Sequence, residues 1–92
     1  MSETERARIL LVDDEVRVLD AMRRNLRTYF DITTATSGAE ALDILQHQGP
    51  FAVLVSDLRM PGMGGLELLA QARNLAPDTT RVLLTPDISR NI

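Results

Sequence analysis

The segment Ile9-Leu-Leu-Val-Asp-Asp14 decides the fold class, and the later segment Phe51-Ala-Val-Leu-Val-Ser-Asp57 repeats its pattern. Each is a short, mainly aliphatic run that is followed by an acidic residue, directly in the first segment and after Ser56 in the second. Such runs are typical of strands inside a parallel sheet, because helices cover both faces of these sheets. We therefore predict two interior strands, over 9–12 and 51–56, with carboxylates directly after each.

The rest of the chain alternates between helical and strand patterns. Apolar residues recur near helical spacing in three segments, whereas two further segments are short and rich in residues that favour strands. The predicted helices cover 15–28, 38–48 and 66–75, and the additional strands cover 32–36 and 81–85. The second helix has the clearest start, a capping box formed by Ser37 and Glu40. This alternation predicts an α/β fold in which helices cover both faces of a parallel sheet.

The composition is that of one globular domain. The 92 residues are 45% hydrophobic and 25% charged, with a net charge of -3, which allows a single, mainly aliphatic core. There is no cysteine, and no apolar run approaches membrane-spanning length, so we expect a cytoplasmic protein that does not contact membranes. The arginines are scattered along the chain, which argues against direct nucleic-acid binding. The polar residues 1–7 should form an N-terminal tail.

Three aspartates follow the predicted interior strands. Because the carboxyl ends of parallel strands emerge at one edge of the sheet, Asp13, Asp14 and Asp57 should converge if these strands are neighbours. Carboxylates so close repel one another unless a cation binds between them, and Mg²⁺ prefers oxygen ligands, including phosphoryl oxygens. An aspartate at such a site could form an acyl phosphate, and the hydroxyl of Thr85 could donate to a phosphoryl oxygen. Each acid alone is more often a turn or helix cap, but together they indicate phosphoryl chemistry.

Other polar residues carry weaker signals. His47 lies between two glutamines on the predicted second helix, where a solvated surface position is favoured over metal binding or catalysis. The arginines of the first helix are interpreted as a solvated face, with partner docking as the less favoured alternative.

Three segments closely resemble the receiver domains of two-component response regulators. They are, in chain order, Ile9–Glu15, Val53–Glu67 and Val82–Thr85. The most specific part is Asp-x-x-Met-Pro, here residues 57–61, followed by Gly-Gly-Leu and then by a strand that ends in threonine. The match covers about residues 8–85.

This resemblance implies a flavodoxin-like fold of strand order 2-1-3-4-5, in which a sensor histidine kinase passes a phosphoryl group to an aspartate, here Asp57. It further implies that Asp14 binds Mg²⁺ directly and Asp13 binds it through water, and that the backbone carbonyl of Arg59 is another ligand. Thr85 matches the switch hydroxyl, whereas Pro61 and Gly65 match loop-shaping positions. A receiver is not an enzyme beyond its own phosphorylation and dephosphorylation.

The sequence also departs from the receiver pattern. Nothing in it matches the fifth strand, the fifth helix or most of the fourth helix, so we expect a truncated sheet of order 2-1-3-4 with 86–92 as an irregular or short helical tail. The chain contains no lysine, so the active-site lysine is missing, and Arg90 is too near Thr85 to replace it. Pro86 follows Thr85 where receivers place a small residue, which should narrow access to the site. We therefore expect impaired switching.

A truncated sheet would leave its fourth strand on a free edge. Such edges pair with other chains, so we expect self-association, most simply as a symmetric homodimer. The alternative function is then a non-signalling fragment that dimerises or binds a kinase. A third function, a phosphatase-type hydrolase, is disfavoured because those enzymes place a second acid where this chain has Arg59.

Overall fold

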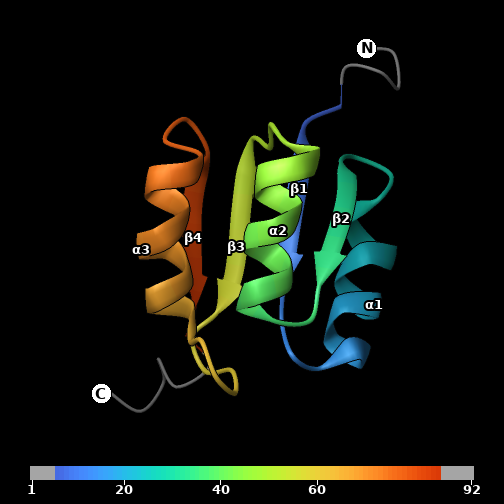
Figure 1. The fold of residues 1–92 in the computed structure, drawn as a ribbon. Helices are drawn as coiled ribbons and strands as arrows, with labels where there is room; N and C mark the ends of the chain where they lie inside the picture. The colour runs from blue at the N-terminus through green and yellow to red at the C-terminus, as the bar shows by residue number, and fades with distance from the viewer. Residues whose placement is uncertain (1–5, 86–92) are drawn as a thin grey trace, which may run out of the picture.

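The computed structural model describes residues 6–85. Their strands are β1 (Arg8–Val12), β2 (Asp31–Ala35), β3 (Val53–Asp57) and β4 (Thr80–Leu84), and their helices are α1 (Val16–Leu26), α2 (Gly38–Gln48) and α3 (Gly65–Leu75). All strand pairs are parallel, and the order across the sheet is β2-β1-β3-β4 (Figure 1). The predicted fold class and strand order are confirmed.

The boundaries of several elements differ from the prediction by one or two residues. The helix predicted over 15–28 begins at Val16, because Glu15 is an extended N-cap with φ -96° and ψ 109°. It ends at Leu26, whose carbonyl accepts from the amides of Tyr29 and Phe30 and turns the chain toward β2. The strand predicted over 81–85 is 80–84, so Thr85 follows β4 instead of ending it.

Helices cover both faces of the sheet, as the aliphatic runs predict. The face that carries Leu10 and Leu54 packs against α2 and α3, which lie side by side in front of the sheet in Figure 1. The other face, with Ile9 and Leu11, packs against Leu19 of α1. Successive residues of β1 thus belong to two separate hydrophobic clusters, one on each face of the sheet. This is why the sequence of the strand is a continuous apolar run.

The capping box at the start of α2 forms with a variation. The Ser37 hydroxyl accepts from the Glu40 amide at 3.1 Å. The Glu40 carboxylate accepts from the amide of Thr36 at 2.7 Å and from its hydroxyl at 3.1 Å, one residue before the cap. The helix start is therefore set by local hydrogen bonds that the sequence pattern predicts.

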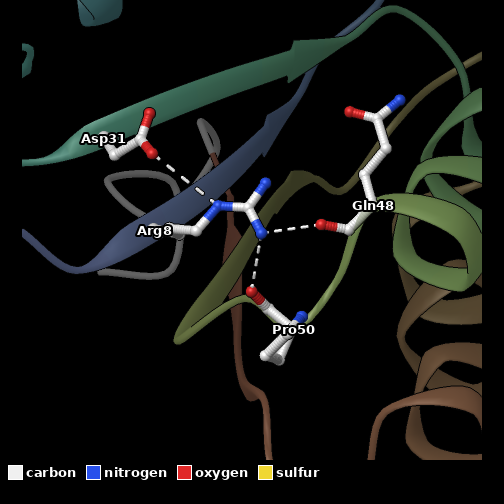
Figure 2. Close-up of polar contacts among 4 residues, drawn as sticks. All are labelled: Arg8, Asp31, Gln48 and Pro50. Carbon is white, nitrogen blue, oxygen red and sulfur yellow. Dashed lines mark hydrogen bonds and ion pairs between the residues drawn. The ribbon is translucent and has the colours of Figure 1, made fainter. Parts of the chain in front are cut away.

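The edge where the strands begin is held by Arg8 (Figure 2). Its guanidinium donates to the carbonyl oxygens of Gln48 at 2.6 Å and Pro50 at 3.1 Å, and its Nε lies 3.7 Å from a carboxylate oxygen of Asp31. The same group lies over the ring of Phe51, 4.3 Å from the centroid. One side chain thus ties β1 to β2 and to the connection between α2 and β3.

Within residues 6–85, one part of the sheet has no helix over it. The helix α1 lies over β1 and β2, while Val82 and Leu84 on the same face of β4 are 37% and 41% exposed. Among residues 6–85, β4 pairs with a neighbour along one side only. The predicted tail 1–7 lies mostly outside the described residues, but Arg6 donates to the Arg27 carbonyl at 2.8 Å. No helix within 6–85 has the length and hydropathy needed to cross a membrane.

Candidate functional site

The topology brings the three predicted aspartates together. In the parallel pair β1 and β3, Val12 lies opposite Ser56, so the next residues, Asp13 and Asp57, emerge side by side at the carboxyl edge. The amide of Asp13 continues the ladder toward β2 by donating to Ala35 at 3.1 Å. One carboxylate oxygen from each of Asp13, Asp14 and Asp57 lies within 4.8 Å of the others. That spacing suits a shared divalent cation.

The acidic cluster carries an electrostatic cost. The pKa of Asp13 is raised, first because its carboxyl is partly buried and then because Asp57, Asp14 and Glu15 repel its charge. A hydrogen bond from the Glu15 amide to the Asp13 carboxylate, at 2.9 Å, acts in the opposite direction. The folded protein therefore disfavours the charged form of Asp13, and a bound cation would remove that penalty. The donor set fits Mg²⁺, because it consists of carboxylate oxygens.

An open groove of about 460 Å³ adjoins the acids. Its lining comes from the ends of three strands and the start of α1, and consists of Asp13, Glu15, Val18, Asp57, Leu84 and Thr85. Thr85 therefore lies in the same groove as Asp57, although it follows β4 and does not end it as predicted. Neither Glu15 nor Val18 was predicted to belong to the site. Glu15 did carry a signal in the sequence, because it adjoins the acidic pair, whereas the exposure of Val18 is evident only in the structure.

The side chains of two other residues considered from the sequence lie outside the cluster of three aspartates. Arg59 is exposed on the loop between β3 and α3, two residues after Asp57. His47 is at the far end of α2, where its ring lies 3.1 Å from the carboxylate of Asp43 on the exposed helix surface. It thus takes no part in the acidic site, in line with the favoured interpretation. Pro86 and Arg90 fall outside the described residues.

Comparison with known proteins identifies the family. Residues 9–91 match the response regulator receiver domain. The chain is 40% identical over 81 residues to the hydrogenase transcriptional regulatory protein HoxA of Cupriavidus necator, and 38% identical over 79 residues to the response regulator MprA of Mycobacterium sp. strain KMS. These matches cover 88% and 85% of this chain, but only 17% and 34% of the relatives. The chain is thus similar to a minor part of each relative.

Solved structures agree with that match. An adenylate cyclase from Rhodopirellula baltica superposes with a TM-score of 0.86 at 41% identity, covering 94% of this chain and 65% of the other. The response regulator TrrA from Thermotoga maritima, crystallised with Mg²⁺ and BeF, superposes with a TM-score of 0.80 at 34% identity, covering 91% and 72%. The similarity therefore extends through nearly all of the described fold.

Proposed function

This chain belongs to the response-regulator receiver family, and on that premise we propose that Asp57 accepts a phosphoryl group from a sensor histidine kinase in a Mg²⁺-dependent reaction. The observation that carries the proposal is the convergence of Asp13, Asp14 and Asp57, with carboxylate oxygens within 4.8 Å of one another at the carboxyl edge of the sheet. The related TrrA structure holds Mg²⁺ and BeF, which supports the same ligand chemistry here. The chain is a signalling module, not an enzyme with a separate substrate.

Each aspartate has a distinct task in this proposal. Asp14, which is exposed, would bind Mg²⁺ directly, and the half-buried Asp13 would hold it through water. Asp57 and the backbone carbonyl of Arg59 would be the other protein ligands. When bound, Mg²⁺ supplies positive charge that stabilises the phosphoryl oxygens during transfer. A carboxylate oxygen of Asp57 forms the new bond to phosphorus, while the bond from phosphorus to the kinase imidazole nitrogen breaks and that nitrogen keeps the electron pair.

Thr85 also takes part in the proposed reaction. It lines the groove beside Asp57, from where its hydroxyl would donate to a phosphoryl oxygen and follow it inward. The chain has no lysine to pair with that group. We therefore propose that phosphorylation is slow and that switching is weaker than in a receiver with a lysine, because one source of stabilising charge is missing.

Phosphorylation is tested with Mg²⁺ and acetyl phosphate, followed by intact mass measurement. The wild type should gain the mass of one phosphoryl group, and Asp57→Asn should gain none. Omission of Mg²⁺ should abolish the gain. An equal gain in Asp57→Asn would show that another residue is the acceptor. A wild type without any gain would contradict the proposal and would favour a non-signalling interaction module.

Within the described residues β4 pairs along one side only, which supports an interaction role in addition. We propose that it pairs with the β4 of a second copy of this chain in an antiparallel, two-fold arrangement centred on Val82. That register places Arg81 opposite Leu83, so no like charges face one another. The alternative is face-to-face packing of two copies through the exposed part of the sheet beside α1. This packing is disfavoured, because α1 lies on the same face and its exposed residues include the charged Arg17, Asp20 and Arg24.

Light scattering after size exclusion tests self-association of the 92-residue chain. A dimer is expected at micromolar concentrations, and Val82→Lys should shift it to monomer, because lysines would face each other at the two-fold axis. A wild-type monomer throughout that range would contradict the proposal.

A further inference from the structure

Gly65, the first residue of α3, packs directly against the backbone of Asp57. A β-carbon built at Gly65 would come inside contact distance of the Asp57 carbonyl oxygen, and would lie 3.1 Å from its carbonyl carbon and 2.7 Å from Cδ1 of Leu83. Gly65 is buried, and its amide donates to the carbonyl of Leu58 at 2.9 Å. The start of the helix therefore touches the peptide that carries the proposed phosphoacceptor.

That peptide has little room to move. The Leu58 amide donates to the carbonyl of Leu84 on β4 at 3.0 Å. The hydroxyl of Ser56, which is fully buried, donates to the Asp57 carbonyl at 3.0 Å. The peptide between Asp57 and Leu58 is thus held by β4, by Ser56 and by the helix start. Leu83 could change rotamer to admit a methyl group at position 65, but the Asp57 carbonyl could yield only if the backbone moved.

We propose that Gly65 is a positioning residue for Asp57. Because it has no side chain, α3 approaches until it meets the Asp57 peptide, and this contact sets how far the Asp57 carboxylate reaches toward Asp13 and Asp14. A methyl group at position 65 would displace the peptide by a distance on the order of 1 Å, enough to spoil a catalytic geometry. The inference rests on the proposed function of Asp57 and assigns a task to a residue outside the acidic cluster.

The neighbouring glycine provides a matched control. A β-carbon at Gly64 would meet only the Leu58 carbonyl, at 3.4 Å, which is an ordinary contact distance, and its φ of -79° suits any residue. Gly64→Ala adds the same methyl group one position away and costs some stability, because alanine is a poorer N-cap than glycine. It therefore reproduces a loss of stability without touching the peptide of Asp57.

The test is Mg²⁺ affinity, measured by isothermal titration calorimetry on variants whose folding is checked by circular dichroism. Gly65→Ala should bind Mg²⁺ about tenfold more weakly or worse, in the range seen when residues that orient metal ligands are changed. Gly64→Ala should bind as the wild type does. The double variant Gly65→Ala/Leu83→Ala should stay weak, because it relieves the contact with Leu83 and leaves the one with Asp57. Wild-type affinity in Gly65→Ala, or recovery in the double variant, would overturn the proposal.

Amide hydrogen exchange in the wild type gives a second measurement if Gly65→Ala fails to fold. Saturating Mg²⁺ should slow exchange of the Gly65 amide, because a metal that holds Asp57 also restrains the next residue, Leu58, whose carbonyl accepts from the Gly65 amide. An unchanged rate would count against the proposal. Neither measurement uses a phosphodonor, so a chain that follows this pattern but gains no phosphoryl mass would overturn the function proposed for Asp57 and leave the role of Gly65 standing.

Discussion

The edge of the sheet where the strands begin and the edge where they end differ in how their charged side chains are paired. At the edge where the strands begin, Arg8 has a carboxylate and two carbonyl oxygens around its guanidinium (Figure 2). The ring of Phe51 also lies beside this group. At the edge where they end, three carboxylates face one another, and the pKa of Asp13 is raised. The first edge satisfies its charge within the chain, whereas the second needs a ligand to do so. The contacts that stabilise the fold therefore lie at one end of the strands, and the proposed functional site lies at the other.

Removal of the Arg8 side chain should have the largest effect on stability. Arg8→Ala loses two charge-assisted hydrogen bonds and the contact with Phe51, so unfolding should become easier by about 2 kcal/mol. Urea denaturation measures the change. Arg24→Ala, on the exposed surface of α1, is the control and should change stability by less than about 0.5 kcal/mol. Equal effects of the two would remove the contrast between the edges.

Removal of one acid at the other edge should have the opposite sign. Without Mg²⁺, Asp57→Asn should be more stable than the wild type by about 0.5 kcal/mol, because one repulsive charge has gone and the site is screened by solvent. Mg²⁺ should then raise the melting temperature of the wild type and raise that of Asp57→Asn much less, since stabilisation by a ligand follows its affinity. A variant less stable than the wild type in the absence of Mg²⁺ would show that the cluster is not a source of strain.

The pH dependence gives a smaller effect with a defined sign. Burial and neighbouring acids raise the pKa of Asp13 above its ordinary value of 3.8, so the folded state binds this proton more tightly than the unfolded state. The stability from Asp13 is fully present below pH 3.8 and is lost as the pH rises through the raised pKa. The stability advantage of Asp13→Asn over the wild type, without Mg²⁺, should therefore shrink on acidification from pH 7. A constant difference in denaturation midpoint would contradict this linkage.

The smallest effect is expected for the ion pair at the Arg8 edge. Asp31→Asn removes a carboxylate that is 3.7 Å from Arg8 and largely exposed, so the loss should be below about 0.5 kcal/mol. Thermal unfolding of this variant beside Arg8→Ala shows which contacts of Arg8 stabilise the fold: the hydrogen bonds to carbonyl oxygens, as we expect, or the ion pair with Asp31. A loss as large as that of Arg8→Ala would favour the ion pair.

Much of the fold and of the acidic site could be predicted from local patterns. The aliphatic runs before Asp13 and Asp57 identified two interior strands, since only strands with helices on both faces are apolar at every position. Two acids at the ends of such strands must share an edge once the strands are neighbours. The strand order itself came from the resemblance to receivers, because the pattern of each strand does not say which other strand it pairs with.

The tasks of Arg8 and Gly65 could not be predicted in this way. Arg8 resembles an ordinary polar residue before a strand, yet its partners at Gln48 and Pro50 are about forty positions away in the chain. Gly65 resembles a loop residue, as the sequence analysis took it, but it is the first residue of α3 and touches the Asp57 peptide. Contacts of this kind depend on how α2 and α3 pack, and the periodicity of a segment does not contain that information.

The amino-acid sequence by itself determined the alternation of strands and helices and the acids at the strand ends, because these follow from hydrophobic period and from chain direction in a parallel sheet. Only the tertiary structure decided the distances among Asp13, Asp14 and Asp57, the raised pKa of Asp13 and the contact that limits where Asp57 lies. Those properties depend on separations of a few ångströms between segments far apart in the chain, and such separations are set by packing.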